Sequence, residues 1–159
     1  MKKTWFITGA SRGFGRIWAE AALKRGDQVT VTARKLADVV DFRERFGDAA
    51  LPLALDVTNA GQVQRVVQEA SAHFGRLDGL VNNAGTSLFA ATEEASDEQI
   101  RGLFDANYFG MVRVLRAALP VLRKQGGGHI LGGLQRAWNH GIAAHRVLLC
   151  NEMGCRSAA

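Results

Sequence analysis

Short apolar runs alternate with helical patterns along most of the chain. In each helical pattern, apolar side chains recur at spacings of three and four residues, as they do on one face of an α-helix. The runs predict strands over residues 4–8, 29–33 and 51–55, a fourth strand around Leu80-Val81, and the opening of a fifth at residues 129–131. Strands that alternate with helices are typical of an α/β fold with a parallel sheet.

The first helix predicted between these strands has an apolar stripe and a clear end. Gly26 is a residue type that commonly ends a helix. The members of the stripe are Phe14, Ile17, Trp18, Ala21 and Ala22. We therefore expect an amphipathic helix here. The later helices are expected over residues 36–46, 63–74 and from Ser96 onward.

The last predicted helix carries one polar residue within its apolar stripe. It starts at Ser96, which has the spacing of a capping box with Gln99. Asn107 falls on the stripe, and because buried amides need hydrogen-bond partners, it either bonds neighbouring backbone or serves a site. The other members of the stripe are Ile100, Leu103, Phe104, Met111, Leu115 and Ala118.

A glycine-rich turn, Thr8-Gly9-x-x-x-Gly13-x-Gly15, joins the first predicted strand to the first helix. Glycine permits positive φ and lets a ligand approach the backbone closely. A helix that begins near Gly13 would point free N–H groups and its positive dipole end toward a nucleotide pyrophosphate. The alternative is an ordinary helix-opening glycine turn.

Polar residues or glycine follow each of the first four predicted strands. Because open α/β sheets bind ligands beyond the carboxyl ends of their strands, this pattern favours a dinucleotide crevice over ordinary turns. Arg34 follows the second strand, where an NAD site usually has an acidic residue, and Arg12 lies in the glycine turn. Two guanidinium groups suit a 2′-phosphate, so we expect NADP(H) rather than NAD(H); the alternative for Arg34 is a solvated surface arginine.

Composition limits the remaining classes of function. The chain has 159 residues, 47% of them apolar, which is enough for one domain with a core. Its net charge is +5, but acidic residues are interspersed among the basic ones. The sequence has no Lys/Arg block of the kind that binds a nucleic-acid backbone. The apolar run after Lys3 is too short for an export or membrane segment. The two cysteines lie near the end and suggest no disulfide framework, so we expect a cytoplasmic protein.

With these residues in place, residues 3–131 resemble the short-chain dehydrogenase/reductase family. The combination and order of the motifs make the resemblance specific. The matching motifs are the glycine turn from Thr8 to Gly15, the adenine-contacting pair Asp56-Val57, the fourth-strand motif Asn82-Asn83-Ala84-Gly85, and the helix-borne Asn107-x-x-Gly110.

The resemblance implies a Rossmann-like, doubly wound parallel sheet in three α/β/α layers, truncated after about the fifth strand. It also implies hydride transfer between NAD(P)(H) and a small alcohol or carbonyl substrate, with a homo-oligomer as an open alternative. Asn107 would be the asparagine of the catalytic tetrad, holding water and backbone in a proton relay. The cofactor-binding residues implied are Gly9, Ser11, Arg12, Gly13, Phe14, Gly15, Arg34, Asp56, Val57, Asn83, Ala84 and Gly85.

The remaining catalytic residues of the family have no counterpart after residue 131. The family places a serine after the fifth strand and then Tyr-x-x-x-Lys, whose tyrosine exchanges the substrate proton. The only tyrosine here is Tyr108, which has Val112 four residues later, and no lysine follows Lys124. We therefore interpret residues 1–131 as an NAD(P)-binding domain and 132–159 as a non-homologous, irregular tail, and we expect a truncated, catalytically impaired chain.

A shifted reading frame is one hypothesis for this tail. Reading one nucleotide downstream, the codons of residues 148–152 permit Tyr-Ser-Ala-Thr-Lys, which resembles the missing motif. The hypothesis places a frameshift near residues 130–133, and sequencing of the encoding DNA decides it.

Two functional alternatives and one metal alternative stay open. The chain could be a non-catalytic NADP-binding fragment, or an interaction module built on a Rossmann scaffold. His140, His145, Cys150 and Cys155 recur every five residues. On a helix this spacing would spread them around the axis, so we expect no metal site.

Overall fold

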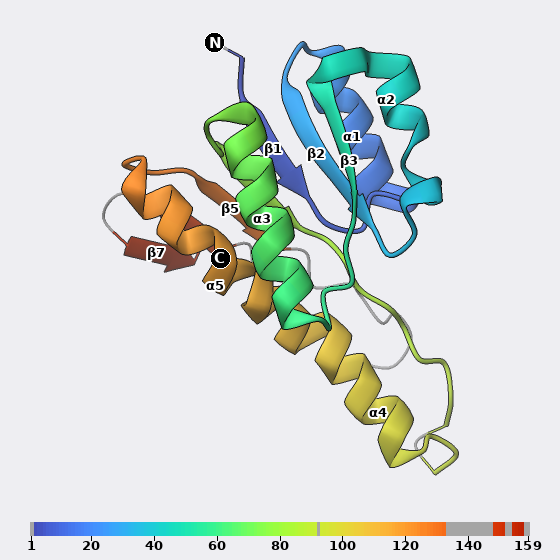
Figure 1. Ribbon diagram of the computed structural model, residues 1–159. Coiled ribbons are helices and arrows are strands. Elements are labelled where there is room, and N and C mark those ends of the chain that lie inside the picture. The colour runs from blue at the N-terminus through green and yellow to red at the C-terminus, as the bar shows by residue number, and fades with distance from the viewer. Residues whose placement is uncertain (1, 92, 133–147, 152–153, 158–159) are drawn as a thin grey trace.

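Five parallel strands form the central sheet in the order β3-β2-β1-β4-β5 (Figure 1). The computed structural model describes residues 2–91, 93–132, 148–151 and 154–157. The strand order reverses direction between β1 and β4, which is where such sheets open a ligand crevice. The predicted α/β fold with a doubly wound parallel sheet is therefore confirmed. The strands are β1 (Thr4–Ile7), β2 (Gln28–Ala33), β3 (Ala50–Ala54), β4 (Gly79–Asn82) and β5 (His129–Gly132).

Helices cover both faces of this sheet, giving the three layers that the resemblance implied (Figure 1). One face carries α1 (Gly13–Lys24) and α2 (Asp41–Phe46), and the other carries α3 (Ala60–Phe74) and α5 (Gly110–Lys124). The shorter elements are the 3₁₀ turns η1 (Leu36–Asp38) and η2 (Gly47–Ala49), the helix α4 (Asp97–Phe104), the π-helical turn η3 (Asp105–Phe109), and an antiparallel pair, β6 (Leu148–Asn151) and β7 (Gly154–Ser157).

Side-chain alternation along the strands divides the apolar core in two. Phe6 of β1 is fully buried among the residues of α3 and α5, whereas the next residue, Ile7, packs with α1 and α2. Phe42 of α2 is also fully buried. Burying such a side chain contributes about 2–3 kcal/mol each. The two cores hold the carboxyl ends of β1, β2 and β4 in register.

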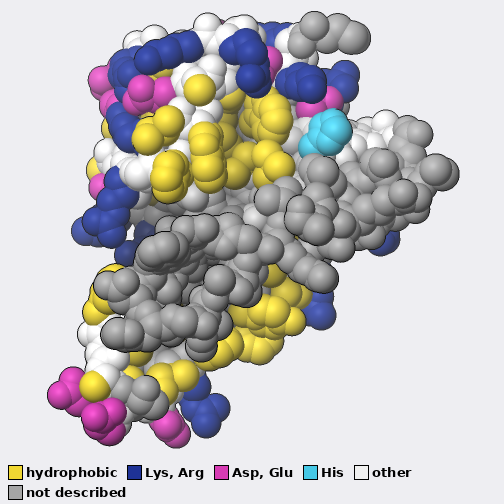
Figure 2. Space-filling view, turned by 180° about the vertical axis from the view of Figure 1, so that it is seen from behind, with side chains coloured by type: hydrophobic (Ala, Val, Ile, Leu, Met, Phe, Trp, Pro, Cys, Tyr) yellow, Lys and Arg dark blue, Asp and Glu magenta, His cyan; other side chains and the backbone are white. Residues whose placement is uncertain are grey.

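The apolar stripe predicted for α1 lies only partly on its buried face. Phe14 is 69% exposed and Ile17 is 59% exposed, whereas Ala19 and Ala22 face the sheet. Small residues on the buried face let the helix approach the sheet closely, and larger ones would hold it away. Figure 2 shows hydrophobic side chains at this surface of the molecule, beside lysine and arginine side chains.

The long helix expected from Ser96 is also different from the prediction. The capping box at Ser96 is present, but α4 buries none of its residues and extends beyond the sheet in line with α5 (Figure 1). The π-helical turn η3 separates it from α5. Because a π turn adds a residue to the helix, the stripe before the turn is rotated relative to the stripe after it. Phe104 is therefore exposed while Ala118 is fully buried.

Part of the tail lies outside the described residues. This applies to His140 and His145, so the expectation about their spacing as metal ligands falls outside the described part of the chain. Among the helices of the described residues, none is long and apolar enough to cross a membrane.

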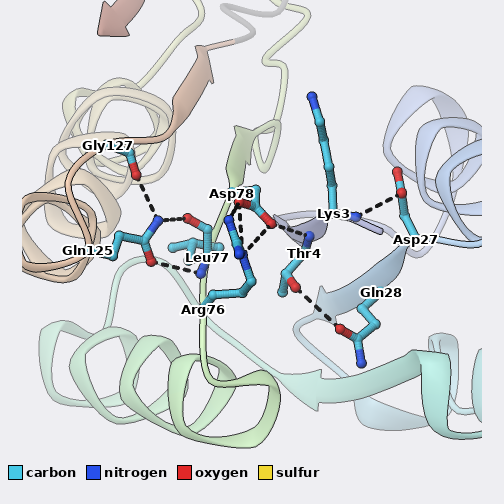
Figure 3. Close-up of polar contacts among 9 residues, drawn as sticks. All are labelled: Lys3, Thr4, Asp27, Gln28, Arg76, Leu77, Asp78, Gln125 and Gly127. Carbon is cyan, nitrogen blue, oxygen red and sulfur yellow. Dashed lines mark hydrogen bonds and ion pairs between the residues drawn. The ribbon is translucent and has the colours of Figure 1, made fainter. Parts of the chain in front are cut away.

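Two carboxylates hold the amino-terminal end of β1, at the end of the sheet opposite the carboxyl ends of the strands (Figure 3). The Lys3 N–H donates to Asp27 Oδ1 at 3.0 Å, and the Thr4 N–H donates to Asp78 Oδ2 at 2.8 Å. Burial raises the pKa of each carboxyl, but hydrogen bonds from Arg25 and Arg76 and from these N–H groups outweigh it. The pKa of both carboxyls is therefore below the ordinary aspartate value.

Acid should destabilise the protein through these two groups. A carboxyl whose pKa is lowered in the folded state contributes stability above its unfolded pKa of about 3.9, and loses it as the pH falls through the folded pKa. We expect the melting temperature to fall steeply below about pH 4. Asp27→Asn should cost about 1–2 kcal/mol at pH 7 and flatten this acid dependence. Thermal melts from pH 7 to pH 3 check it, and an acid slope identical to wild type would contradict the role of Asp27.

One buried hydroxyl in the core has no hydrogen-bond partner among the described residues. Thr30 in β2 is 1% exposed and its Oγ1 is unsatisfied. In Thr30→Val a methyl group replaces this unsatisfied hydroxyl. We therefore expect the variant to be more stable than wild type by about 1 kcal/mol. Thr32→Val is the matched control: Thr32 Oγ1 donates to Ile7 O at 3.2 Å, so its loss should destabilise by about 1 kcal/mol. Denaturant midpoints measure both, and shifts of the same sign would contradict the argument.

Candidate cofactor site

The glycine turn leaves the first N–H groups of α1 without a side-chain cap. Gly9 and Gly13 have φ of +68° and +62°, a conformation that favours glycine. Arg12 is the N-cap residue of α1, in extended conformation, and its side chain makes no capping bond. Ser11 is half-buried, and Arg12 and Phe14 are exposed. The start of α1 can therefore offer backbone donors and its dipole to an anion.

Two of the glycines allow the turn to pack against the end of β4. A Cβ on Gly9 would lie 2.8 Å from Ala84 Cα. A Cβ on Gly15 would overlap Gly9 O and Asn83 Nδ2. Among the described residues nothing lies within 4 Å of a Cβ on Gly13, so there the backbone conformation is what requires glycine. Gly9 and Gly15 are thus needed for close packing, and Gly13 is needed for its positive φ.

Thr8 and Asn83 fasten the glycine turn to the end of β4. Thr8 Oγ1 accepts hydrogen bonds from the N–H groups of Asn83 and Ala84, both at 2.9 Å. Asn83 Nδ2 donates to Thr8 O at 3.1 Å and to Gly9 O at 2.9 Å. Thr8 is fully buried. The segments that follow β1 and β4, distant in sequence, are therefore joined at the carboxyl edge of the sheet.

Asp56 and Val57 form the turn after β3. Asp56 Oδ1 accepts from Thr58 N at 2.9 Å and from Thr58 Oγ1 at 2.8 Å. The backbone hydrogen bond from Thr58 lowers the pKa of Asp56, and the nearby charge of Arg34 adds to this. Val57 is buried and packs against Gly110, where a Cβ would lie 2.6 Å from Val57 Cγ2. The Asp56 carboxylate is thus ionised and held at the carboxyl edge.

Three cations at this edge have no carboxylate within ion-pair distance among the described residues. They are Arg12, Arg34 and Lys35, all exposed. Arg16, one turn further along α1, differs because it pairs with Asp41 and Glu20. The unpaired cations are available to an anion, and Lys35 was not selected from the sequence although it adjoins Arg34.

Asn107 lies in the π-helical turn and bonds the backbone after β4. Its Oδ1 accepts from Thr86 N at 2.8 Å, and its Nδ2 donates to Thr86 O at 2.7 Å. Gly85 links Thr86 to Ala84, which contacts the glycine turn. The structure therefore shows the backbone bonds that the sequence analysis gave as one alternative for Asn107. Asn82 adds a further tie, since its Nδ2 donates to Met111 O at 3.0 Å.

Comparison with known proteins places these features in a family. Residues 3–132 match the family model described as short chain dehydrogenase. Over 152 aligned residues the chain is 43% identical to Oxidoreductase BOA17 of Botryotinia fuckeliana (strain B05.10), covering 92% of this chain and 55% of the relative.

Solved structures agree with this match. The fold is similar to that of a short-chain dehydrogenase from Streptomyces avermitilis, with a TM-score of 0.78 and 42% identity over 82% of this chain and 48% of the other. It is also similar to ElxO with NADP bound, with a TM-score of 0.75 and 30% identity over 82% of this chain and 54% of that one. The chain spans about half the length of these relatives. Its glycine turn, its strand ends and these matches together show that it belongs to the short-chain dehydrogenase family.

Proposed function

We propose that the chain binds NADP(H) at the carboxyl edge of its sheet, as the cofactor-binding part of an oxidoreductase. Members of its family are oxidoreductases that use nicotinamide cofactors. When bound, the nicotinamide ring supplies or accepts a hydride at an alcohol or carbonyl carbon. The observation that carries the proposal is the start of α1, which Arg12 does not cap, together with Arg12 and Arg34, which have no ion-pair partner among the described residues. An anion binds such a helix start and guanidinium groups favourably.

Each part of the edge has a proposed role in holding the cofactor. The N–H groups at the start of α1 bind the pyrophosphate, and Arg12, Arg34 and Lys35 bind the 2′-phosphate. Asp56 and the Val57 turn contact the adenine end. The backbone from Asn83 to Gly85 flanks the nicotinamide ribose. Asn107 fixes that backbone through Thr86, so its contribution is to hold the nicotinamide end in place.

Titration of NADPH and NADH tests the cofactor preference. We expect NADPH to bind at least about tenfold more tightly, because charge-assisted hydrogen bonds to a phosphate contribute about 1.5–3 kcal/mol. Arg34→Ala should remove most of this difference, and Arg116→Ala, an exposed arginine on α5, should leave it unchanged. Energy transfer from tryptophan to the reduced nicotinamide gives the readout. Equal affinities for NADPH and NADH in the wild-type chain would contradict the 2′-phosphate assignment.

A second candidate is NADP(H) binding without turnover by this chain alone. It is supported by the sequence, in which no Tyr-x-x-x-Lys occurs and Tyr108 is followed by Val112. On this proposal residues 1–131 bind the cofactor, and the chain is impaired because the proton donor is missing. Single-turnover oxidation of bound NADPH with a panel of aldehydes and ketones separates the two candidates. An interaction module on the same scaffold would bind neither cofactor.

A further inference from the structure

The π-helical turn that carries Asn107 needs a specific stabilising contact. Turns of this kind are rare, and they occur mostly as single bulges inside α-helices at functional sites. In η3 the Gly110 N–H donates to Asp105 O, five residues back. A regular α-helix would pair residues four apart instead. Something beyond the helix's own backbone must therefore favour the wider turn.

Arg113 lies in the first turn of α5 and reaches back along the helix to this turn. Its Nη2 lies 2.6 Å from Asp105 Oδ1, and its Nη1 donates to Asp105 O at 3.3 Å. The same Nη1 lies 3.4 Å from Val57 O. The side chain of Arg113 is 27% exposed, so these contacts are partly shielded from water. Its guanidinium group thus joins the π turn to the turn after β3.

Because Gly110 has no side chain, the helix at the π turn can contact the turn after β3. A Cβ at Gly110 would overlap the Val57 side chain, so the β3 turn packs directly on the helix. The charge of Arg113 also makes a small contribution to lowering the pKa of Asp56, next to Val57. The guanidinium group contacts one carboxylate and two backbone carbonyls, and its several N–H donors can bond all three acceptors at once.

We propose that Arg113 is a positioning residue: it holds the π turn open and thereby keeps Asn107 on the backbone of Thr86 at the nicotinamide end of the site. The π turn contains one residue more than a regular α-helical turn would. If it relaxed to a regular α-helix, α4 would rotate relative to α5 by the angle of one residue, about 100°. Asn107 would then leave Thr86. The inference rests on the proposed cofactor site for its functional meaning, but its structural part can be tested without cofactor.

Amide exchange at Thr86 is the direct readout, because the Thr86 N–H donates to Asn107 Oδ1. In ¹⁵N-labelled protein, Arg113→Ala should speed exchange of this amide about tenfold, as Asn107→Ala should, while strand amides such as that of Phe6 stay protected. Arg116→Ala, an arginine on the same helix with an exposed side chain, should have no effect. Arg113→Lys keeps the positive charge but loses the planar set of N–H donors of the guanidinium group. The Thr86 amide of this variant should therefore exchange at an intermediate rate.

An Asp105 variant and an NADPH titration test the role of Arg113 independently of the Arg113 variants. If Arg113→Ala does not fold, Asp105→Asn removes the same ion pair and should also speed Thr86 exchange. Unchanged Thr86 exchange in the folded Arg113 or Asp105 variants would overturn the proposal. NADPH titration of the same samples reports separately on the cofactor site: failure of the wild-type chain to bind NADPH would refute the proposed function and leave the Thr86 result standing.

Discussion

Replacing Gly15 by alanine should remove NADPH binding and strongly destabilise the fold. The added Cβ would overlap Gly9 O and Asn83 Nδ2, both part of the junction between the glycine turn and the end of β4. Backbone atoms cannot move aside as a flexible side chain can, so we expect a cost of about 3 kcal/mol or more. NADPH affinity in any folded fraction should fall at least about a hundredfold, because the donors at the start of α1 are displaced. Denaturant unfolding and NADPH titration measure the two effects.

Gly102→Ala is the matched control for this variant. Gly102 lies inside α4, and apart from the helix's own backbone no described residue has a heavy atom within 4 Å of a Cβ built there. Alanine should therefore stabilise the protein by about 0.5–1 kcal/mol through helix propensity and leave NADPH binding unchanged. If Gly15→Ala had the same stability and NADPH affinity as Gly102→Ala, close packing of the turn on β4 could not be the reason for glycine at position 15.

Thr8→Val should have the second largest effect. Valine has nearly the same shape as threonine but lacks the Oγ1 that accepts from the N–H groups of Asn83 and Ala84. Two donors would lose their partner at a fully buried side chain, which should cost about 2–4 kcal/mol. NADPH affinity should fall about tenfold or more, since the turn is no longer fixed to β4.

Serine at the same position separates the hydroxyl from the shape of the side chain. Thr8→Ser retains the acceptor and loses only a methyl group, so it should lie within about 1.5 kcal/mol of wild type and keep most of its NADPH affinity. Calorimetry and fluorescence titration of the pair provide the comparison. Equal loss in both variants would show that the methyl group, and not the hydrogen bonds, holds the turn.

Much of the sheet was predictable because buried parallel strands have a simple signature. The runs around Phe6, Val31 and Leu80 are short, apolar and followed by turn residues, and each forms a strand of the sheet within a residue or two of the predicted bounds. The expectation that polar strand ends gather at one edge follows from the parallel direction of the strands alone. Thr8 and Asn83 do meet there.

Helix faces were less predictable, because apolar periodicity does not reveal how close a helix must approach the sheet. In α1 the stripe of large residues around Ile17 is exposed and the alanine face is buried. The π turn at Asn107 was also hidden, since the contact from Arg113 to Val57 that we propose helps to stabilise it is long-range, and no local spacing encodes it. Lys35 could have been found from its position beside Arg34 at the end of β2.

The position of bound NADP⁺ tests the central proposal most directly. In an NMR titration of ¹⁵N-labelled protein, we expect saturable shifts of the amide signals of Gly9, Gly13 and Gly85 at the carboxyl edge. The amides of Asp27 and Asp78, at the opposite edge, should not move. No saturable shift up to about 1 mM NADP⁺, or shifts confined to the edge that carries Asp27 and Asp78, would contradict the account.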